Sequence, residues 1–380
     1  MQTNKIKTFV NRDKELNYLK NWISQEPNYL LFCYGPKNCG KTSLLMNFVE
    51  NQLNNKSYVI KHIDLKQNPI ASYSDFIQVF FTPDNLDASE KVKKKRLYNI
   101  FRLPIEIIEG MEDKSLDPFV VMKKELQKKV KKGKQPVIII DEVQAIEPPY
   151  RNGLKEFFKE LFNFFVAMTK ESHLCHVVIA GSDGYFLNSI YDDSRLSKSC
   201  GYFEMTHLSK NNVYAWLRDL EQESKINSFT LTDDQIETIW QHLGGNIFEI
   251  SSVLAQLKPA GKKKSISNAK LMKMIEKQTS ESIDLLRDYA GFRENKRDLL
   301  REIYAINEKM KETPGRKGFS MSDLIHLVKN KQYDIITLDS ELNKLVRNNI
   351  LAFSPVSADY CLQGYSMDIA LKRYLDSLVF

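Results

Sequence analysis

Short apolar runs alternate with helical patterns over the first 206 residues. Strand-like runs cover about 29–34, 57–65, 136–140, 175–182 and 202–206, and helical spacing of apolar residues covers about 41–53, 118–134 and 153–170. The four consecutive β-branched residues Val137–Ile140 are typical of a strand that is buried on both faces of a parallel sheet. The alternation predicts an open α/β sheet that binds its ligand at the carboxyl ends of the strands.

Residues 66 to about 117 interrupt this alternation. Prolines at positions 69, 83 and 104 divide the segment, and no regular pattern runs through it. We expect an irregular insertion, because a connection this long between two core strands is seldom a simple loop. Its basic run, Lys91–Arg96, fits either a solvated helix face or a contact with nucleic acid.

From Ser209 onward the pattern is helical. Ser209 and Thr232 are expected to cap helices that end near 220 and 243, and two further helices cover about 247–257 and 268–289. These segments predict a small helical bundle over 207–290.

The last segment, 291–380, combines helices with two short strands. Helices are expected over about 294–308, from Ser320 to Val328, after a cap at Thr337 and over about 367–378, with strands at 350–353 and 360–365. Helices followed by a hairpin predict a winged helix-turn-helix. On the helix after Thr337, the candidate DNA contacts are Asn343, Lys344 and Arg347. Glu341 is also expected to be exposed there, and acidic residues on this helix favour a packing or protein-contact role instead.

The strand-like run at 30–34 leads into a glycine-rich loop. Gly35, Gly40, Lys41 and Thr42 form the pattern G-x-x-x-x-G-K-[ST], with a strand before it and a helix after it. Glycine lets the backbone curl around a phosphate, and N–H groups of the loop and helix then face the α- and β-phosphates. Lys41 is expected to reach the β- and γ-oxygens, and the Thr42 hydroxyl to hold Mg2+. The predicted nucleotide-binding residues are Gly35, Pro36, Lys37, Asn38, Cys39, Gly40, Lys41, Thr42 and Ser43.

Polar side chains also follow two other buried strands. Asp141 and Glu142 come directly after Val137–Ile140, and Ser182 ends the run that begins at 175. We expect Asp141 to hold the water shell of Mg2+ and Glu142 to orient and deprotonate the attacking water. Ser182 lies where a γ-phosphate sensor is expected in this class of fold. With Lys41, these three residues are the predicted catalytic set.

Composition limits the class of protein more than it limits the partner. A chain of 380 residues is expected to form two or three domains. No apolar run is long enough to span a bilayer, and the N-terminus has no signal-peptide core. Five cysteines without a C-x-x-C pair indicate free thiols, so we expect a cytoplasmic protein. The net charge of +7 is compatible with nucleic acid but does not establish it.

With these residues assembled, the chain resembles the archaeal ATPase family, part of the STAND branch related to AAA+ proteins. The matching segments are Phe9–Leu16 (F-x-x-R-x-x-E-L), Gly35–Leu45, Ile138–Gln144 (I-I-x-D-E-x-Q) and Ile179–Ser182. The resemblance implies a P-loop ATPase core over 1–206, a helical lid over 207–290 and a winged helix over 291–380. It also places Phe9 and Val10 near the adenine and adds Arg12 to the nucleotide-binding residues.

Two departures from the family pattern bear on the nucleotide site. Gly244–Ile247 lacks the proline of the relatives' G-G-x-P motif, which bears on the lid's contact with nucleotide. Ser199 stands at the usual arginine position of S-P-L-x-x-R, and the candidate substitutes Arg195 and Lys198 do not have the expected spacing. Because of this second departure, we expect hydrolysis to be slow or to need an arginine from a partner.

The sequence predicts a Mg2+-dependent ATPase that works as a switch. ATP held between core and lid would favour one arrangement of the domains, and hydrolysis would release it. Two alternatives stay open. One is an initiator- or transposition-type ATPase that binds duplex DNA, and the other is a scaffold that holds nucleotide with little turnover and presents the winged helix to a protein. The oligomeric state stays open as well.

Overall fold

The chain divides into two compact units in a computed structural model. The structure describes residues 10, 12–53, 57–84, 100–146, 154–184, 186, 199–257, 265–313 and 315–378. The sheet unit contains Asp13–Tyr34 and Lys41–Glu204, and the helical unit contains Met1–Arg12, Gly35–Gly40 and Met205–Phe380. Among the described helices, none has the length and apolar character needed to cross a membrane.

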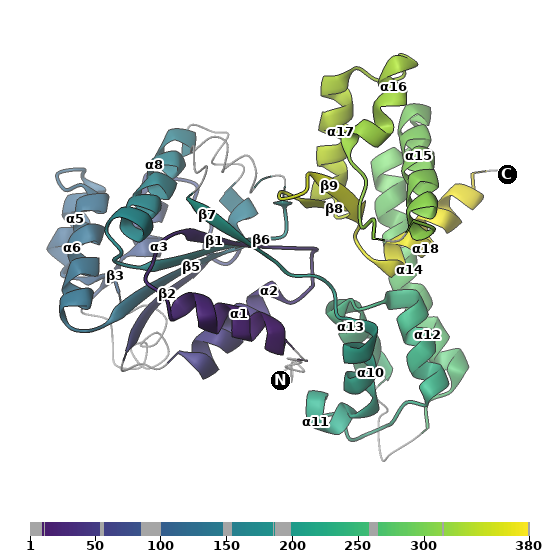
Figure 1. Cartoon of the computed structure of the whole chain (residues 1–380), viewed down its shortest axis with the longest axis horizontal. Coiled ribbons are helices and arrows are strands. Elements are labelled where there is room, and N and C mark those ends of the chain that lie inside the picture. The colour runs from purple at the N-terminus through teal and green to yellow at the C-terminus, as the bar shows by residue number, and fades with distance from the viewer. Residues whose placement is uncertain are drawn as a thin grey trace. The chain divides into compact units, whose positions relative to one another are not determined.

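A five-stranded parallel sheet forms the centre of the sheet unit (Figure 1). In the order β2–β5–β6–β1–β7, its strands are β2 (Tyr58–Asp64), β5 (Gln135–Asp141), β6 (His176–Gly181), β1 (Leu30–Tyr34) and β7 (Cys200–Glu204). Strands β1 and β6 are buried along their whole length, as expected for a parallel sheet that is covered on both faces. The predicted open α/β sheet is confirmed.

Helices cover both faces of this sheet. They include α1 (Asp13–Ile23), α2 (Lys41–Asn47) with the π-helix η1 (Phe48–Gln52), α6 (Pro118–Lys131), and α8 (Lys155–Val166) with the π-helix η4 (Ala167–Glu171). Alternate strand residues point to opposite faces of the sheet. Phe32 of β1 joins the core that α6 and α8 share. His176 of β6 points to the other face, where its ring forms a T-shaped pair with Trp22 of α1, with ring centroids 4.8 Å apart. Figure 1 shows α1 and α2 on one side of the sheet and α8 on the other.

Part of the segment 66–117 is regular, so the prediction of an irregular insertion is wrong there. Its elements are α3 (Tyr73–Phe80), β3 (Thr82–Pro83), β4 (Arg102–Leu103) and α5 (Ile105–Glu112). Phe76 and Phe80 of α3 are buried in the core on the α8 face of the sheet. Burial of this apolar face stabilises α3, and spacing of prolines gave no sign of it. The basic run Lys91–Arg96 lies outside the described residues.

The first part of the helical unit is a bundle of helices, of which α14 is the longest. They are α10 (Lys210–Arg218), α11 (Leu220–Ser224), α12 (Asp233–Leu243), α13 (Ile247–Leu257) and α14 (Asn268–Ala290). Both predicted caps are confirmed: the side chain of Ser209 accepts a hydrogen bond from a backbone N–H of α10, and Thr232 forms a capping box with Gln235. The indole of Trp216 is fully buried in the bundle core.

The C-terminal part adds further helices and a hairpin. Its elements are α15 (Glu294–Lys311), the 3-10 helix η5 (Met321–Leu324), α16 (Ile325–Lys329), α17 (Ile335–Arg347), β8 (Leu351–Ser354), β9 (Asp359–Leu362) and α18 (Tyr365–Asp376). Strands β8 and β9 pair in antiparallel fashion, and Phe319 forms an additional bridge to Tyr360. The two short strands that the sequence predicts after α17 therefore form a hairpin.

Two predictions about α17 are wrong. The helix begins one turn earlier than expected, because Asp334 and not Thr337 is its N-cap and accepts the N–H of Thr337 at 2.9 Å. Glu341 is buried, with 6% of its surface exposed, and accepts a hydrogen bond from Tyr289 Oη at 2.9 Å. Lys296 Nζ lies 3.5 Å from the same carboxylate, so an ion pair compensates its burial.

Candidate nucleotide site

The glycine-rich loop has a backbone that few residues can adopt. The φ angles are +151° at Gly35, +64° at Asn38 and +98° at Gly40. A Cβ atom on Gly35 would lie 1.9 Å from the carbonyl oxygen of Met205. Glycine is therefore required at position 35 by contact as well as by φ, in agreement with the role that the sequence pattern assigned to it.

Arg12 holds this loop from inside the helical unit. Its side chain is 4% exposed, and Nη2 donates to the carbonyls of Cys39 at 2.7 Å and Thr206 at 2.9 Å. These bonds support the loop backbone directly. Val10 is buried in the bundle core beside Leu208 and others, and Phe9 lies outside the described residues.

Two residues from distant parts of the chain also lie against the loop. The N–H of Lys37 donates to Gln363 Oε1 at 3.1 Å, and a Cβ on Gly40 would lie 3.3 Å from Ile247 Cδ1. No pattern in the sequence indicates a role for Gln363, which lies 326 residues after Lys37 and belongs to no recognised motif. A cavity of about 200 Å³ beside this link is lined by Lys37, Asn38, Gln363 and residues of α13, α14 and α18.

The sheet unit holds the remaining predicted site residues. Lys41 opens α2 and is only 5% exposed, Thr42 is half-buried, and Ser43 is exposed. Burial raises the pKa of the Glu142 carboxyl group, and the positive charge of Lys41 opposes that shift. Both members of the predicted catalytic set belong to the sheet unit.

Asp141 ends β5 with its carboxylate buried. Only 1% of the residue is exposed, and Oδ1 accepts the N–H of Glu142 at 2.9 Å. Oδ2 is buried without a hydrogen-bond partner among the described residues, and His62 Nε2 lies 3.9 Å from it. A buried carboxylate oxygen of this kind suits a hard, hydrated cation such as Mg2+. The Thr42 hydroxyl is also an oxygen ligand that suits Mg2+.

Glu142 is held in an unusual conformation. Its φ of +56° places a non-glycine residue in the left-handed region, which costs free energy and is found often at functional sites. Burial raises the pKa of its carboxyl group and the neighbouring Asp141 raises it further, while Lys41 opposes both effects. A carboxylate with a raised pKa is a better proton acceptor than an ordinary glutamate.

Gln144 connects Glu142 to Ser182. Its Nε2 donates to Glu142 Oε2 at 2.9 Å and to Ser182 Oγ at 3.2 Å, from the 3-10 helix η2 (Val143–Ile146). The structure therefore brings Glu142 and the residue after β6 together, as predicted. The sequence showed Gln144 as part of a motif, but only the fold shows which groups it joins.

The candidate DNA contacts on α17 are less freely presented. Lys344 is exposed, but its Nζ pairs with Glu341 Oε1 at 2.7 Å. Asn343 and Arg347 are half-buried. The ion pair reduces the positive charge that Lys344 could offer to a phosphate backbone.

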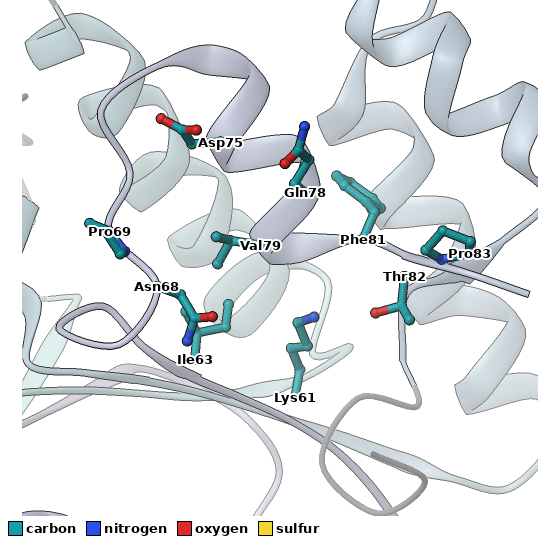
Figure 2. A pocket seen from close by; sticks show the side chains of 10 residues that line it. All are labelled: Lys61, Ile63, Asn68, Pro69, Asp75, Gln78, Val79, Phe81, Thr82 and Pro83. Carbon is teal, nitrogen blue, oxygen red and sulfur yellow. The ribbon is translucent and has the colours of Figure 1, made fainter. Parts of the chain in front are cut away.

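A separate cavity of about 410 Å³ in the sheet unit contains none of the predicted site residues (Figure 2). Figure 2 shows Lys61 rising from β2 with its nitrogen directed into the cavity, beneath Gln78 and Phe81. Lys61 is 1% exposed as a residue. This cavity is formed by β2 and the α3 region, and it is distinct from the residues described above.

Comparison with known proteins gives a consistent result. Residues 9–253 match the family described as an ATPase domain predominantly from Archaea. An uncharacterized ATP-binding protein of Methanocaldococcus jannaschii is 34% identical over 65% of this chain and 71% of its own length. Another from the same organism is 30% identical over 97% of this chain and 99% of its own length.

Two solved structures share the fold. A Walker-type ATPase of Pyrococcus abyssi has a TM-score of 0.64 at 16% identity and matches over 96% of both chains. The ADP form of the ORC2 protein of Aeropyrum pernix has a TM-score of 0.53 at 12% identity, over 99% of this chain and 96% of that chain. The family match spans more than half of the sequence and includes the phosphate loop, Asp141, Glu142 and Ser182. The chain belongs to the archaeal ATPase family.

Proposed function

We propose that the protein is a Mg2+-dependent P-loop ATPase whose nucleotide state controls its C-terminal segment. The observation that carries this proposal is the link from Glu142, directly after the buried Asp141, through Gln144 Nε2 to Ser182 Oγ. ATP binding agrees with the names of the archaeal relatives, which are ATP-binding proteins.

Each residue has a distinct task in the proposed reaction. Lys41 neutralises charge on the β- and γ-phosphates. Thr42 and Asp141 Oδ2 would hold Mg2+, which would supply positive charge to offset the negative charge on the phosphates. Glu142 accepts a proton from the attacking water, while Gln144 fixes its Oε2.

The same residues support a switch. The Gln144 amide donates to both Ser182 Oγ and Glu142 Oε2. A γ-phosphate that bonds Ser182 would therefore change the hydrogen bonding of the proposed catalytic carboxylate. We propose three functional domains, a core over 1–206, a lid over 207–290 and a winged helix over 291–380. The β8–β9 hairpin with its Phe319–Tyr360 bridge supports the winged-helix assignment.

Turnover measurements test the proposal. Wild type is expected to hydrolyse ATP slowly and only with Mg2+. Glu142→Gln should bind ATP but lose turnover by about 10²- to 10⁴-fold, because it lacks a proton acceptor. Lys41→Ala should lose both binding and turnover. Glu160→Gln changes an exposed glutamate of α8 and is the matched control. Equal turnover by Glu142→Gln and wild type would refute the assigned base, and tight binding without any turnover would favour the nucleotide-holding scaffold.

DNA binding through α17 is a second candidate, supported by the hairpin that follows this helix. Duplex DNA added to the same assay should then raise turnover, and affinity should fall steeply with salt. Lys344→Ala and Arg347→Ala should weaken it. No salt-dependent binding would reject this candidate.

A further inference from the structure

Gln363 joins the phosphate loop to the C-terminal hairpin. The residue follows β9 and is 8% exposed. Its Oε1 accepts the N–H of Lys37 at 3.1 Å, and its Nε2 donates to the carbonyl of Leu351 at 2.9 Å. Its own N–H donates to the carbonyl of Ile350 at 3.1 Å, and its carbonyl accepts from His207 Nε2 at 3.0 Å. Both ends of the side-chain amide and both backbone groups are therefore engaged.

These contacts fix the direction of the side chain. The Leu351 carbonyl needs a donor and the Lys37 N–H needs an acceptor, so only one orientation of the amide satisfies both. The backbone bonds to Ile350 and His207 hold the Cα in place. Gln363 is thus a rigid support with an acceptor presented to the loop.

The loop needs such a support. Asn38, directly after Lys37, has a φ of +64°, a conformation that a non-glycine residue adopts at some cost. On this side of the loop, the cavity of about 200 Å³ replaces close packing. The hydrogen bond from the Lys37 N–H to Gln363 therefore constrains the backbone at Lys37 and Asn38, where the cavity leaves it without close packing.

We propose that Gln363 is a positioning residue of the nucleotide site, which holds the phosphate loop in its ligand-binding shape before nucleotide arrives. The inference rests on the proposed nucleotide-binding function and adds the coupling of that site to the β8–β9 hairpin. Pre-ordering a binding loop raises affinity, since less ordering remains to be done on binding. By linkage, nucleotide bound at the loop stabilises the hairpin to the same extent.

The test compares wild type with Gln363→Met, which keeps the length of the side chain and removes its acceptor and donor. Calorimetry with a non-hydrolysable ATP analogue and Mg2+ should show affinity weakened by about three- to tenfold, the value of one hydrogen bond. Hydrogen exchange should show that the analogue protects β8–β9 amides in wild type, and that this protection is lost in Gln363→Met.

Two controls separate positioning from general destabilisation. Phe353→Leu loosens the hairpin by removing the ring pair with Tyr360, whose centroids are 4.9 Å apart, without a change at the loop. It should lower the melting temperature and leave affinity within about twofold. Gln332→Met repeats the substitution at an exposed position and should change neither.

The outcomes distinguish this inference from the proposed function. Equal affinity and equal hairpin protection in Gln363→Met and wild type would overturn the inference alone. An equal loss of affinity in Phe353→Leu would also overturn it, because hairpin stability would then be the cause. Failure of wild type to bind the analogue would overturn the proposed function and this inference together.

Discussion

Replacing Arg12 with methionine tests whether the phosphate loop depends on support from outside its own motif. Arg12 is 4% exposed as a residue, and the substitution removes its guanidinium, which donates to the carbonyls of Cys39 at 2.7 Å and Thr206 at 2.9 Å. Methionine fills much of the space but donates no hydrogen bond. The Cys39 carbonyl belongs to the loop, and the Thr206 carbonyl belongs to the segment that leads into α10, so the variant releases the loop from its anchor.

The expected effect follows from the charge and burial of these bonds. A hydrogen bond from a charged donor contributes about 1.5–3 kcal/mol, and one such bond reaches the loop itself. If nucleotide binding must restore the loop without it, affinity falls by about tenfold to a hundredfold. Calorimetry with ADP and with a non-hydrolysable ATP analogue measures this loss. Both ligands should lose similar affinity, because the loop is proposed to bind the α- and β-phosphates that they share.

Arg218→Met is the matched control. Arg218 makes an exposed ion pair with Asp233 at 3.0 Å on the surface of the bundle. Its loss should change stability little and leave affinity unchanged, because an exposed ion pair contributes little to stability. Affinity of Arg12→Met within about twofold of wild type would refute the reasoning, since the loop would then keep its shape without Arg12.

Three further changes have defined outcomes. Gly35→Ala would place a Cβ 1.9 Å from the Met205 carbonyl oxygen, so it should cost about 1–3 kcal/mol in thermal unfolding and abolish nucleotide binding. Gln144→Met should lower kcat about tenfold with little change in KM, because the catalytic carboxylate loses its positioning bond; an unchanged kcat would contradict this. Burial raises the pKa of Glu249 to about 7, although a bond from Ser366 opposes the shift. A raised folded-state pKa favours folding below about pH 4.5 and loses that effect as pH rises through about 7, so Glu249→Gln should gain stability relative to wild type above pH 7 and not below pH 4.5.

The sheet could be predicted because its central strands β1, β5 and β6 are buried on both faces. Val137–Ile140 is apolar without interruption, and a short run of this kind is typical of a strand inside a parallel sheet. The polar residues that follow such runs, Asp141 and Ser182, then had to lie at one edge of the sheet. This geometry is independent of the details of loops, and for that reason the sequence was sufficient.

Short sequence patterns were misleading where tertiary contacts determine the start of a helix or the burial of a side chain. Thr337 has the chemistry of an N-cap, but Asp334 can accept two backbone N–H groups, and α17 starts there instead. Glu341 looked like a surface residue because glutamate is seldom buried. Its carboxylate is compensated by Tyr289 and Lys296, which lie 52 and 45 positions earlier in the chain (341 − 289 and 341 − 296), and no short window of sequence contains that information.

The family resemblance placed Arg12 at the nucleotide site, but the backbone groups that Arg12 and Gln363 bond could not be predicted, for the same reason. The loop motif itself is contiguous, but Arg12 and Gln363 reach its backbone from 27 and 326 residues away. Both side chains bond main-chain groups. Every residue type has a main-chain carbonyl, and every type except proline has a main-chain N–H. A pairing between a side chain and a main-chain group therefore leaves no complementary residue type in the sequence.

The path of the chain connects these supports with the proposed switch. Residues Gly35–Gly40 group with the helical unit, whereas β1 before them and α2 after them group with the sheet unit. Lys41, the first residue of α2, is therefore bonded directly to a segment that Arg12 and Gln363 hold. A change in those holding contacts therefore reaches Lys41 through the backbone. If Gln363 positions the loop as proposed, Gln363→Met should weaken nucleotide affinity although every predicted catalytic side chain is intact.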